Sequence, residues 1–426
     1  MNESALPASR QVVVGAGGQT PLKFAFWGVR AEIVVDNVAH YAAETGECVA
    51  CIEVPGDYEQ ALGGQFAAGE GPDVFYAQRA EASLWDAQGH LAPIDETEPT
   101  VAPLLRRMDH RLVDGARNRD GRLIGLTYYN GGPFALFAHE AFAGHVDLDS
   151  LKDWEAVLNQ LRRAKRDGLS PHPFVPRWHR SQTGLVWSLL CHLASEGVLN
   201  FDAPDAPAAL RDALEFFASL VNEDLVPAAS LADEADAAAL ERWASGRHML
   251  TFTPDYLAMD ACEGAGRPIN IVAPRLPGRT GTPLMPGHAL LCMRSGIDDA
   301  LLTRARGLLT YLGGTAPDGS LRVHSRWLSE RLFAVPYAEL DARAGIRAGM
   351  ARAFPEGLAG ACVERLIEAR RSAEVSPPTH APWFLEWSAM CDATIRYELL
   401  RDRTMSAASA ADALLEKWSI LAARTR

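Results

Sequence analysis

The first group of residues that could bind a ligand follows the apolar segment LKFAFWG (22–28). Trp27 ends this segment, and Arg30 and Glu32 come just after it. An aromatic ring can stack on the flat apolar face of a sugar, and charged groups can form bidentate hydrogen bonds with its hydroxyl groups. These residue types predict a site for a small polyhydroxylated ligand. The alternatives are core packing for Trp27 and a surface ion pair between Arg30 and Glu32.

A second group follows the apolar segment DVFYA (73–77), where Gln78 and Arg79 come directly after Tyr76 and Ala77. Their position matches that of Trp27 after the first segment, so we predict that Gln78 and Arg79 belong to the same site. Tyr76 itself is equally compatible with a place in the core.

The elements that must position these residues alternate along the chain. The segments 22–28, 48–54 and 73–77 have the length and apolar content of buried strands, and residues of helical spacing lie between them. This βαβαβ order predicts a parallel sheet with helices on both faces. The carboxyl ends of parallel strands share one edge of the sheet, which is where open α/β proteins bind ligands. We therefore expect Trp27 and Gln78 to lie near each other.

The same alternation continues through the rest of the chain, with strand-like segments at 248–252, 268–274 and 288–294. The fold class is therefore α/β. With 426 residues, the chain is long enough for two or three domains.

The overall charge excludes two classes of partner. The chain has 41 Lys and Arg against 54 Asp and Glu, which gives a net charge of -13. Such a surface repels nucleic acid and anionic lipid, so we expect neither as a partner. Residues 1–20 form a polar leader without the positive and apolar regions of a secretion signal. Either a signal has been removed or the protein stays in the cytoplasm.

The seven cysteines, an odd number, favour a reducing compartment. Cys48 and Cys51 could suggest a redox or zinc motif, but they lie three apart in a predicted strand. Residues at that spacing lie about 10 Å apart on opposite faces, too far for a disulfide. We interpret both as small apolar residues of a sheet.

Sequence motifs for cofactors and metals are missing. The segment VVVGAGGQT does not have the glycine spacing of a dinucleotide site, and there is no P-loop or zinc-protease motif. His172 and His179 have no convincing third ligand nearby. We expect no cofactor, no metal and no catalytic residue.

Seven segments in order resemble the family 1 extracellular solute-binding proteins, the group that includes the maltose-binding protein. They are KFAFWG, ALGGQFAAGEGPDVFYA, WDAQGHLAPID, GRLIGLTYY, SLKDWEAVLNQLRRAK, LERWASGRHMLTFTPDY and TMSAASAADALLEKW. Thr127 replaces the proline that is usual in this family, and Ala138-His139-Glu140 replaces its usual Tyr-Asn-Lys.

The resemblance implies a two-lobed periplasmic-binding-protein-like fold of type II, in which each lobe is a sheet flanked by helices. The N-lobe would comprise 21–127 and 280–333, and the C-lobe 128–279 and 334–426. The hinge crossings would lie near Thr127, Pro277 and Ala334. The implied function is to capture a small polar ligand, a sugar or another polyhydroxylated or anionic solute, for the membrane permease of an ABC importer. The implied location is the periplasm or the cell surface, with the cytoplasm as the alternative.

The resemblance adds candidate residues around the hinge and in the C-lobe. Three of these candidates, Tyr128, Tyr129 and Asn130, precede Gly131-Gly132, where the backbone could approach a ligand closely. The alternative is a turn stabilised by Asn130. Asp255 could instead cap a helix, and Trp383 could pack a helix against a lobe. The added candidates are Tyr128, Tyr129, Asn130, Trp178, Arg180, Thr253, Asp255, Tyr256 and Trp383.

Two rival functions remain. One is an enzyme on the same scaffold, as in thiaminase I, with Cys191 as the nucleophile, although Cys191 lies in an apolar helical pattern typical of a core. The other is a cytoplasmic sensor or carrier that has kept the binding fold.

Overall fold

The first apolar segments form neighbouring strands of one mixed sheet in a computed structural model that describes residues 10–15, 18–180, 184–375 and 377–424. The strand order is β1-β3-β2-β4-β12-β5, and β6 also pairs with β12. Strand β2 is parallel to β3 and β4, as the sequence predicts. The strands are β1 (Arg10–Val14), β2 (Leu22–Trp27), β3 (Val49–Val54), β4 (Val74–Gln78), β5 (Leu91–Ala92), β6 (Leu126–Asn130) and β12 (His288–Arg294).

Part of the predicted leader belongs to this sheet, which corrects the sequence analysis. Residues Arg10–Val14 pair antiparallel with β3 at the edge of the sheet. Val12 and Val13 are 39% and 52% exposed. An edge strand with exposed valines does not show the burial pattern by which the other strands could be recognised.

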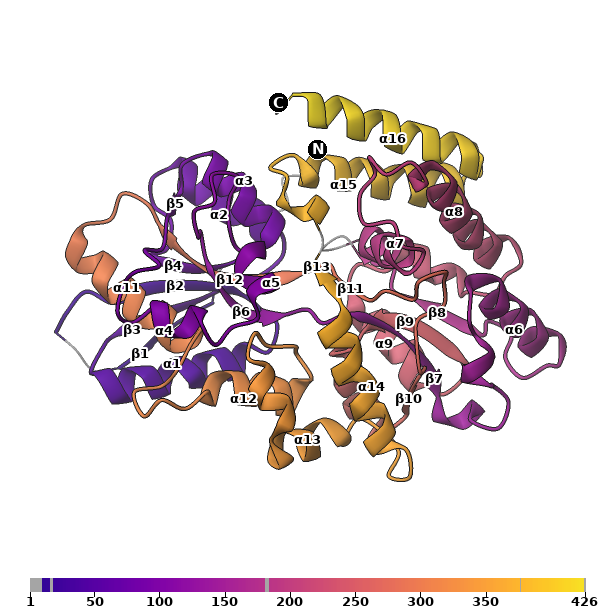
Figure 1. Ribbon diagram of the computed structural model, residues 1–426, viewed down its shortest axis with the longest axis horizontal. Helices are drawn as coiled ribbons and strands as arrows, with labels where there is room; N and C mark the ends of the chain where they lie inside the picture. Colours follow the sequence, from indigo (N-terminus) through magenta and orange to yellow (C-terminus); the bar gives the residue numbers. More distant parts are fainter. Residues whose placement is uncertain (1–9, 16–17, 181–183, 376, 425–426) are drawn as a thin grey trace.

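Helices cover both faces of this sheet (Figure 1). Asp57 caps α2 by accepting a hydrogen bond from the backbone of Gln60 at 3.0 Å, and Tyr58, Leu62 and Phe66 face inward at a spacing of four. The helices are α1 (Ala31–Thr45), α2 (Tyr58–Ala67), α3 (Arg79–Ala87), α4 (Ala102–Leu105), α5 (His110–Gly115) and α11 (Asp299–Leu312).

A second, four-stranded sheet of order β10-β7-β9-β8 forms the other lobe. Its strands are β7 (Phe134–His139), β8 (Phe174–Pro176), β9 (Leu250–Pro254) and β10 (Asn270–Val272). Its helices are α6 (Trp154–Arg166), α7 (Gly184–Ser195), α8 (Ala206–Asn222), α9 (Asp236–Ala244) and α10 (Leu257–Ala265).

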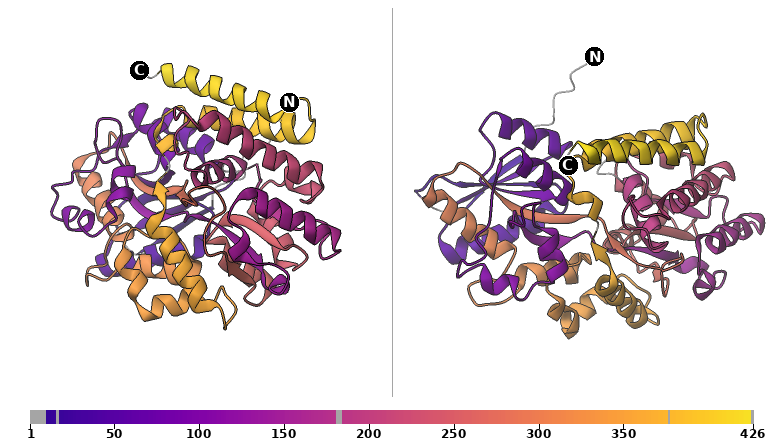
Figure 2. Two further views of the ribbon diagram at one scale, coloured as in Figure 1. Left: turned by 45° about the vertical axis from the view of Figure 1, so that its right-hand side comes forward. Right: turned by 45° about the horizontal axis from the view of Figure 1, so that its top comes forward.

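The C-terminal helices extend this lobe. Helix α16 (Ala407–Ala423) lies along α8 and α15 (Phe384–Ala393) (Figures 1 and 2). A π-helical stretch, η7 (Thr394–Arg401), follows α15. Three helices, α12 (Arg322–Arg331), α13 (Ala344–Ala351) and α14 (Ala359–Ser372), lie below the junction of the lobes in Figure 1. Short strands β11 (Leu284–Met285) and β13 (Glu374–Val375) pair beside the junction. Two lobes, each a sheet with flanking helices, therefore confirm the predicted fold class.

Three segments cross between the lobes side by side. The backbone N–H of Asn130 donates to the carbonyl of Ala334 at 2.6 Å, and that of Gly131 donates to the carbonyl of Gly287 at 3.0 Å. The crossings predicted near Thr127 and Ala334 lie beside these hydrogen bonds.

Another crossing was predicted near Pro277, and Gly287, which accepts from Gly131, lies ten residues further along the chain. The loop that contains Pro277 is bonded to the second lobe, because Gly278 N–H donates to the Lys152 carbonyl at 2.9 Å and Thr280 N–H to the Ser195 carbonyl at 3.0 Å. The division into lobes at residues 127, 279 and 333 stays a prediction.

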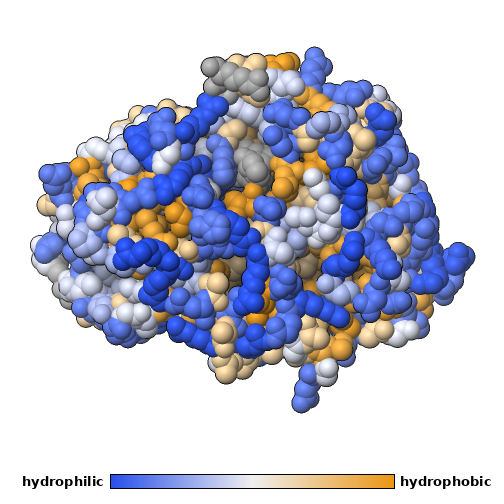
Figure 3. Space-filling view, viewed as in Figure 1, coloured by the Kyte–Doolittle hydropathy of each residue, from blue (hydrophilic) through white to orange (hydrophobic). Residues whose placement is uncertain are grey.

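The outer surface agrees with the composition. Hydrophilic side chains cover most of the face shown in Figure 3, and hydrophobic surface is confined to separate patches. Within the described residues, no helix has the length and apolar content needed to cross a membrane.

The seven cysteines all lie in the described part of the chain, where they are buried and free. Burial raises the pKa of Cys51 to about 12 and that of Cys191 well above its usual value. Neither Cys48 nor Cys51 is disulfide-bonded; Cys51 lies in β3 as interpreted, whereas Cys48 directly precedes this strand.

We therefore expect all seven thiols to react with a thiol reagent in denaturant without reductant, and to react slowly in the folded protein. The reason is that the reactive species is the thiolate, which burial disfavours. A colorimetric thiol titration measures both rates. Recovery of a single thiol in denaturant would mean three disulfides and would contradict the structure.

Candidate functional site

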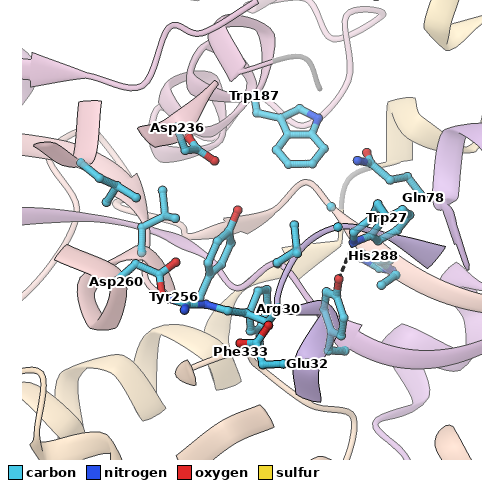
Figure 4. A pocket seen from close by; sticks show the side chains of 18 residues that line it. Trp27, Arg30, Glu32, Gln78, Trp187, Asp236, Tyr256, Asp260, His288 and Phe333 are labelled. Atoms are coloured by element: carbon cyan, nitrogen blue, oxygen red, sulfur yellow. Dashed lines mark hydrogen bonds and ion pairs between the residues drawn. The ribbon is translucent and has the colours of Figure 1, made fainter. Parts of the chain in front are cut away.

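A cavity of about 440 Å³ lies between the two lobes. One wall comes from the ends of β2 and β4 and the start of β12, and the other comes from α7, α9 and α10. Figure 4 shows Trp27 and Gln78 facing Trp187, Asp236 and Tyr256 across the cavity. The edge predicted from the strand order is thus one side of this interlobe cavity.

Aromatic rings form much of this cavity. The indole N–H of Trp27 donates to the Tyr129 hydroxyl at 2.7 Å. Tyr256 is stacked on Phe333, with ring centroids 4.4 Å apart and an interplanar angle of 11°. These flat surfaces suit a ligand with apolar faces and polar edges.

The ring of Trp187 lies against the backbone of Gly287. A Cβ atom at position 287 would lie 2.7 Å from Cη2 of Trp187, so only glycine allows this contact. Trp187 and Phe333 were not predicted. Trp187 stands in the apolar helix GLVWSLLCH, where its sequence context is that of a core residue.

A group of ion pairs joins the lobes along one wall. Arg30, before α1, pairs with Asp260 and Glu263 of α10, and Arg331 of α12 pairs with Glu263. Burial raises the pKa of Asp260, and the Arg30 guanidinium partly offsets this effect. Arg30 has a positive φ of 54°, which costs backbone energy for a residue other than glycine.

Asp236, the first residue of α9, is fixed from behind. Nε and Nη2 of Arg177 donate to its two carboxylate oxygens at 2.7 and 3.0 Å, and Nε2 of His179 lies 3.0 Å from Oδ1. Burial opposes ionisation, but Arg177 and His179 together hold the pKa of Asp236 well below its usual range. Asp236 was not predicted, because its Ala-rich segment is typical of a solvated helix.

Six of the fourteen predicted residues line the cavity. They are Trp27, Arg30, Glu32, Gln78, Tyr129 and Tyr256. Their position is what the predictions require, and their contact with a ligand stays a prediction.

Three predicted residues of the first sheet do not line the cavity. The guanidinium of Arg79 is buried and donates to the Ser83 hydroxyl and the Arg117 carbonyl. Tyr128 is the extra residue of a β-bulge in β6, opposite the Ala289/Leu290 step of β12, and packs against Tyr76 and Trp327.

Asn130 is also buried, at the end of β6, where its backbone pairs with Ala334. Of the two glycines after it, Gly131 lines the cavity and Gly132 does not. Gly132 has a φ of 67°, and its missing Cβ would overlap the Asp255 carboxylate.

The predicted C-lobe aromatics also lie outside the cavity. Trp178 is 2% exposed and packs on Phe217, with ring centroids 5.2 Å apart. Trp383 contacts Trp418 of α16 edge to face at 4.6 Å, which agrees with the alternative of helix packing. Both positions were inferred from the resemblance, and the loops that carry them turn the rings into the lobe.

The polar C-lobe candidates have partners elsewhere. Arg180 pairs with Glu234 at 3.0 Å on the surface. Asp255 is fully buried and accepts from Nε of Arg370 at 2.7 Å, and burial raises its pKa to about 6 against the effect of Arg370. Thr253 lines a separate small cavity behind Asp236.

The structure gives no support for Cys191 as a nucleophile. Its thiol is fully buried in α7, where its Sγ atom lies 3.8 Å from the Leu284 carbonyl and burial raises its pKa well above the usual value. The neighbouring His192 stacks on Trp154 at 4.3 Å, and burial lowers its pKa to about 3. In the described ranges, no three His, Cys, Asp or Glu side chains are grouped to hold a metal ion.

Two α/β lobes, three adjacent crossings and a cavity between the lobes define the class of hinged two-lobed binding proteins. The family model described as bacterial extracellular solute-binding protein matches residues 37–318, which is more than half of the chain. The chain therefore belongs to this family of binding proteins. The family is extracellular.

Solved structures share the fold over nearly the whole chain. Maltose-bound MalE3 of T. maritima has a TM-score of 0.75 at 16% identity, covering 94% of this chain and 99% of its own. An ABC transporter solute-binding protein of Thermotoga lettingae, bound with α-D-tagatose, has a TM-score of 0.73 at 17% identity, covering 95% and 100%. A D-mannitol-bound solute-binding protein of Agrobacterium vitis has a TM-score of 0.69 at 13% identity, covering 95% and 98%. No curated protein sequence matches the chain.

We expect Trp178→Ala to reduce the free energy of unfolding by about 3–5 kcal/mol, because it removes a large ring from a packed interior. Denaturant unfolding measures this loss. The folded fraction should bind ligand with unchanged affinity, because Trp178 does not line the cavity. A variant of normal stability with lost affinity would return Trp178 to the site.

We expect Arg30→Gln to shift the ligand-free protein toward an open form, because the substitution removes a charge that joins the lobes. Small-angle scattering should show a larger radius of gyration than for the wild-type protein. Arg304→Gln is the matched control, because Arg304 pairs with Glu47 on the same lobe. Identical scattering from Arg30→Gln and the wild-type protein would show that these pairs do not hold the lobes together.

Proposed function

We propose that this protein captures a small carbohydrate or sugar alcohol between its lobes and delivers it to the membrane permease of an ABC importer. The observation that carries the proposal is the interlobe cavity, where Trp27, Trp187 and Tyr256 offer rings from both lobes. Polar groups such as Gln78 and Asp236 stand beside these rings. Stacking surfaces with polar groups at their edges are what a sugar ring requires.

The cavity volume supports a small ligand. At about 440 Å³ it falls within the usual range for small-molecule sites, about 300–1,000 Å³. Proteins of the same fold carry ligands of this chemistry, since their structures hold maltose, tagatose and mannitol. We extend this ligand class to the present chain because its cavity has matching walls.

The anionic ligands that the sequence left open have less support. Of the three arginines that suggested them, Arg30 pairs with two carboxylates, Arg79 is buried against a hydroxyl and a carbonyl, and Arg180 pairs with Glu234 on the surface. We therefore favour an uncharged or aminated ligand.

The proposal includes binding without chemistry. The rival mechanism needs a thiolate at Cys191, and burial disfavours that ionised form. The proposed location is the extracellular side of the membrane, in keeping with the family. Fractionation of cells that make the full-length protein separates this location from that of a cytoplasmic carrier.

We expect a thermal-shift screen of sugars and sugar alcohols to find a stabilising ligand, because a ligand at 100 times its Kd adds about 2.7 kcal/mol to the stability of the folded state. Small-angle scattering should then show a smaller radius of gyration with this ligand, since a ligand that touches both lobes favours the closed form. Mass spectrometry after long incubation should find the ligand unchanged.

Two outcomes would contradict the proposal. Conversion of the ligand, abolished in Cys191→Ser, would establish an enzyme. Stabilisation only by compounds without hydroxyl groups would reject carbohydrate as the ligand class.

A further inference from the structure

Among the residues that the structure describes, the partners of the Asp236 carboxylate leave one of its hydrogen-bonding positions open. An ionised carboxylate offers about four acceptor positions, two on each oxygen. Oδ1 faces both Nε of Arg177 and Nε2 of His179, and Oδ2 accepts from Nη2 of Arg177. The remaining position on Oδ2 belongs to a side chain that is 24% exposed and lines the interlobe cavity.

The groups behind Asp236 keep this acceptor in place. The side chains of Arg177 and His179 are 2% and 1% exposed, so neither can easily turn toward solvent or change its partner. The Arg177 guanidinium also lies over the rings of Phe134 and Trp187, at 5.8 and 5.5 Å from their centroids. The acceptor is therefore pre-organised, and binding does not have to supply the energy to order it.

Carboxylates outnumber guanidinium groups around the cavity. Among its lining residues, the carboxylates are Glu32, Asp236 and Asp260, and the guanidinium is that of Arg30. With their partners Arg177, Arg331 and Glu263 included, four carboxylates stand against three guanidinium groups, and the imidazole of His179 lies behind Asp236. Burial lowers the pKa of His288, another lining residue, to about 3, so its imidazole adds no positive charge at neutral pH.

The positive charge of Arg177 does not compensate, inside the cavity, for the negative charge of the carboxylates that line it. Its guanidinium faces Asp236 and lies between two aromatic rings, and the residue lines the small cavity behind the wall. A phosphate or carboxylate in the interlobe cavity would therefore meet Glu32, Asp236 and Asp260 beside the guanidinium of Arg30, whose Nη2 already donates to Asp260 and Glu263. A hydroxyl or ammonium group would meet the acceptor of Asp236.

We infer that Asp236 determines ligand specificity by accepting a hydrogen bond from a ligand hydroxyl or ammonium group. The cavity then selects neutral or aminated polyols over their phosphorylated or carboxylated counterparts. This inference rests on the proposed function, because it assigns the ligand charge at the same site.

Matched ligands test the selectivity in the wild-type protein. The probes are glucose, glucosamine and glucose 6-phosphate, together with mannitol and mannitol 1-phosphate, alongside a general metabolite library. Calorimetry on those that shift the melting temperature gives their affinities. The phosphorylated member of any set that binds should be weaker by about 100-fold or more, because like charges placed together cost several kcal/mol. Equal or tighter binding of the phosphorylated member would overturn the inference and leave carbohydrate capture intact.

Substitution tests the residue itself. Asp236→Asn should reduce the affinity for the best neutral ligand by about 10- to 100-fold, the range for a lost hydrogen bond to a charged group. It should also reduce the ratio between the affinities for the neutral and the phosphorylated ligand. A purely structural role would leave that ratio unchanged. Asp212→Asn, an exposed change on α8, is the matched control and should bind as the wild-type protein does.

Asp236→Asn also leaves Arg177 buried without its counter-ion, so Asp236→Glu is the second variant. It keeps the negative charge but moves the acceptor by one methylene, and it should lose affinity while retaining the preference for neutral ligands. Normal affinity in both variants would overturn the inference.

Failure of the proposed function and failure of the role of Asp236 give different results. If no carbohydrate binds but another metabolite does, the proposed function fails, and the charge of that metabolite decides the inference. An anion as the best ligand rejects the role of Asp236, and a neutral or cationic compound weakened by Asp236→Asn supports it. A library without any stabilising compound rejects both.

Discussion

The binding cavity depends on the backbone hydrogen bonds that hold three chain crossings together. Asn130 donates to Ala334, and Gly131 donates to Gly287, so the ends of β6 and the start of β12 are fixed beside the third crossing. These bonds lie between the end of β6 and the start of β7, where the chain passes from the first sheet to the second. The carboxyl ends of β2 and β4 consequently face α9 and α10, and residues more than two hundred positions apart become opposite walls of one space.

The forces that close the lobes are weaker than those that define the hinge. Arg30 and Glu263 are 26% and 47% exposed, and ion pairs so open to solvent contribute about 0–1 kcal/mol each. The hinge region, by contrast, contains the buried pair of Asp255 and Arg370, and Arg370 also donates to the Leu332 carbonyl. Breaking a buried pair by removing one partner costs about 3–5 kcal/mol. The connection between the lobes is therefore firm, while their closure remains within the reach of ligand binding energy.

The sequence predicted the elements better than the side chains that meet across the cavity. Alternating apolar strands and helices indicated the first sheet, and strand order placed Trp27 and Gln78 at the correct edge. The residues Tyr128 and Tyr129 show the limit of this reasoning. Their rings lie 5.3 Å apart at a β-bulge, both against Tyr76 and Trp327, and composition alone does not say that only Tyr129 lines the cavity.

The missed residues share one property, because each acquires its role through a contact distant in sequence. Asp236 stands in an Ala-rich segment, and its partner Arg177 lies 59 positions earlier. Trp187 and Trp178 both occur near apolar residues, yet only Trp187 reaches the cavity, since the absence of a side chain at Gly287 leaves room for its ring. The sequence around Trp187 does not indicate that a glycine one hundred residues away leaves room for its ring.

Stacking groups and charged groups occupy different places relative to the hinge, and this division affects how binding is coupled to closure. Tyr129 and Phe333 belong to the crossing segments or adjoin them, and Trp187 rests on Gly287 of the second crossing. Arg30, Asp236 and Asp260 belong to the lobes themselves. In a hinge motion, atoms near the axis move least, so opening preserves the aromatic floor and separates the charged walls. Under the proposed function, an open form would hold a ligand on the rings beside the hinge, and closure would add Trp27 and Tyr256 from the two walls together with the charged groups.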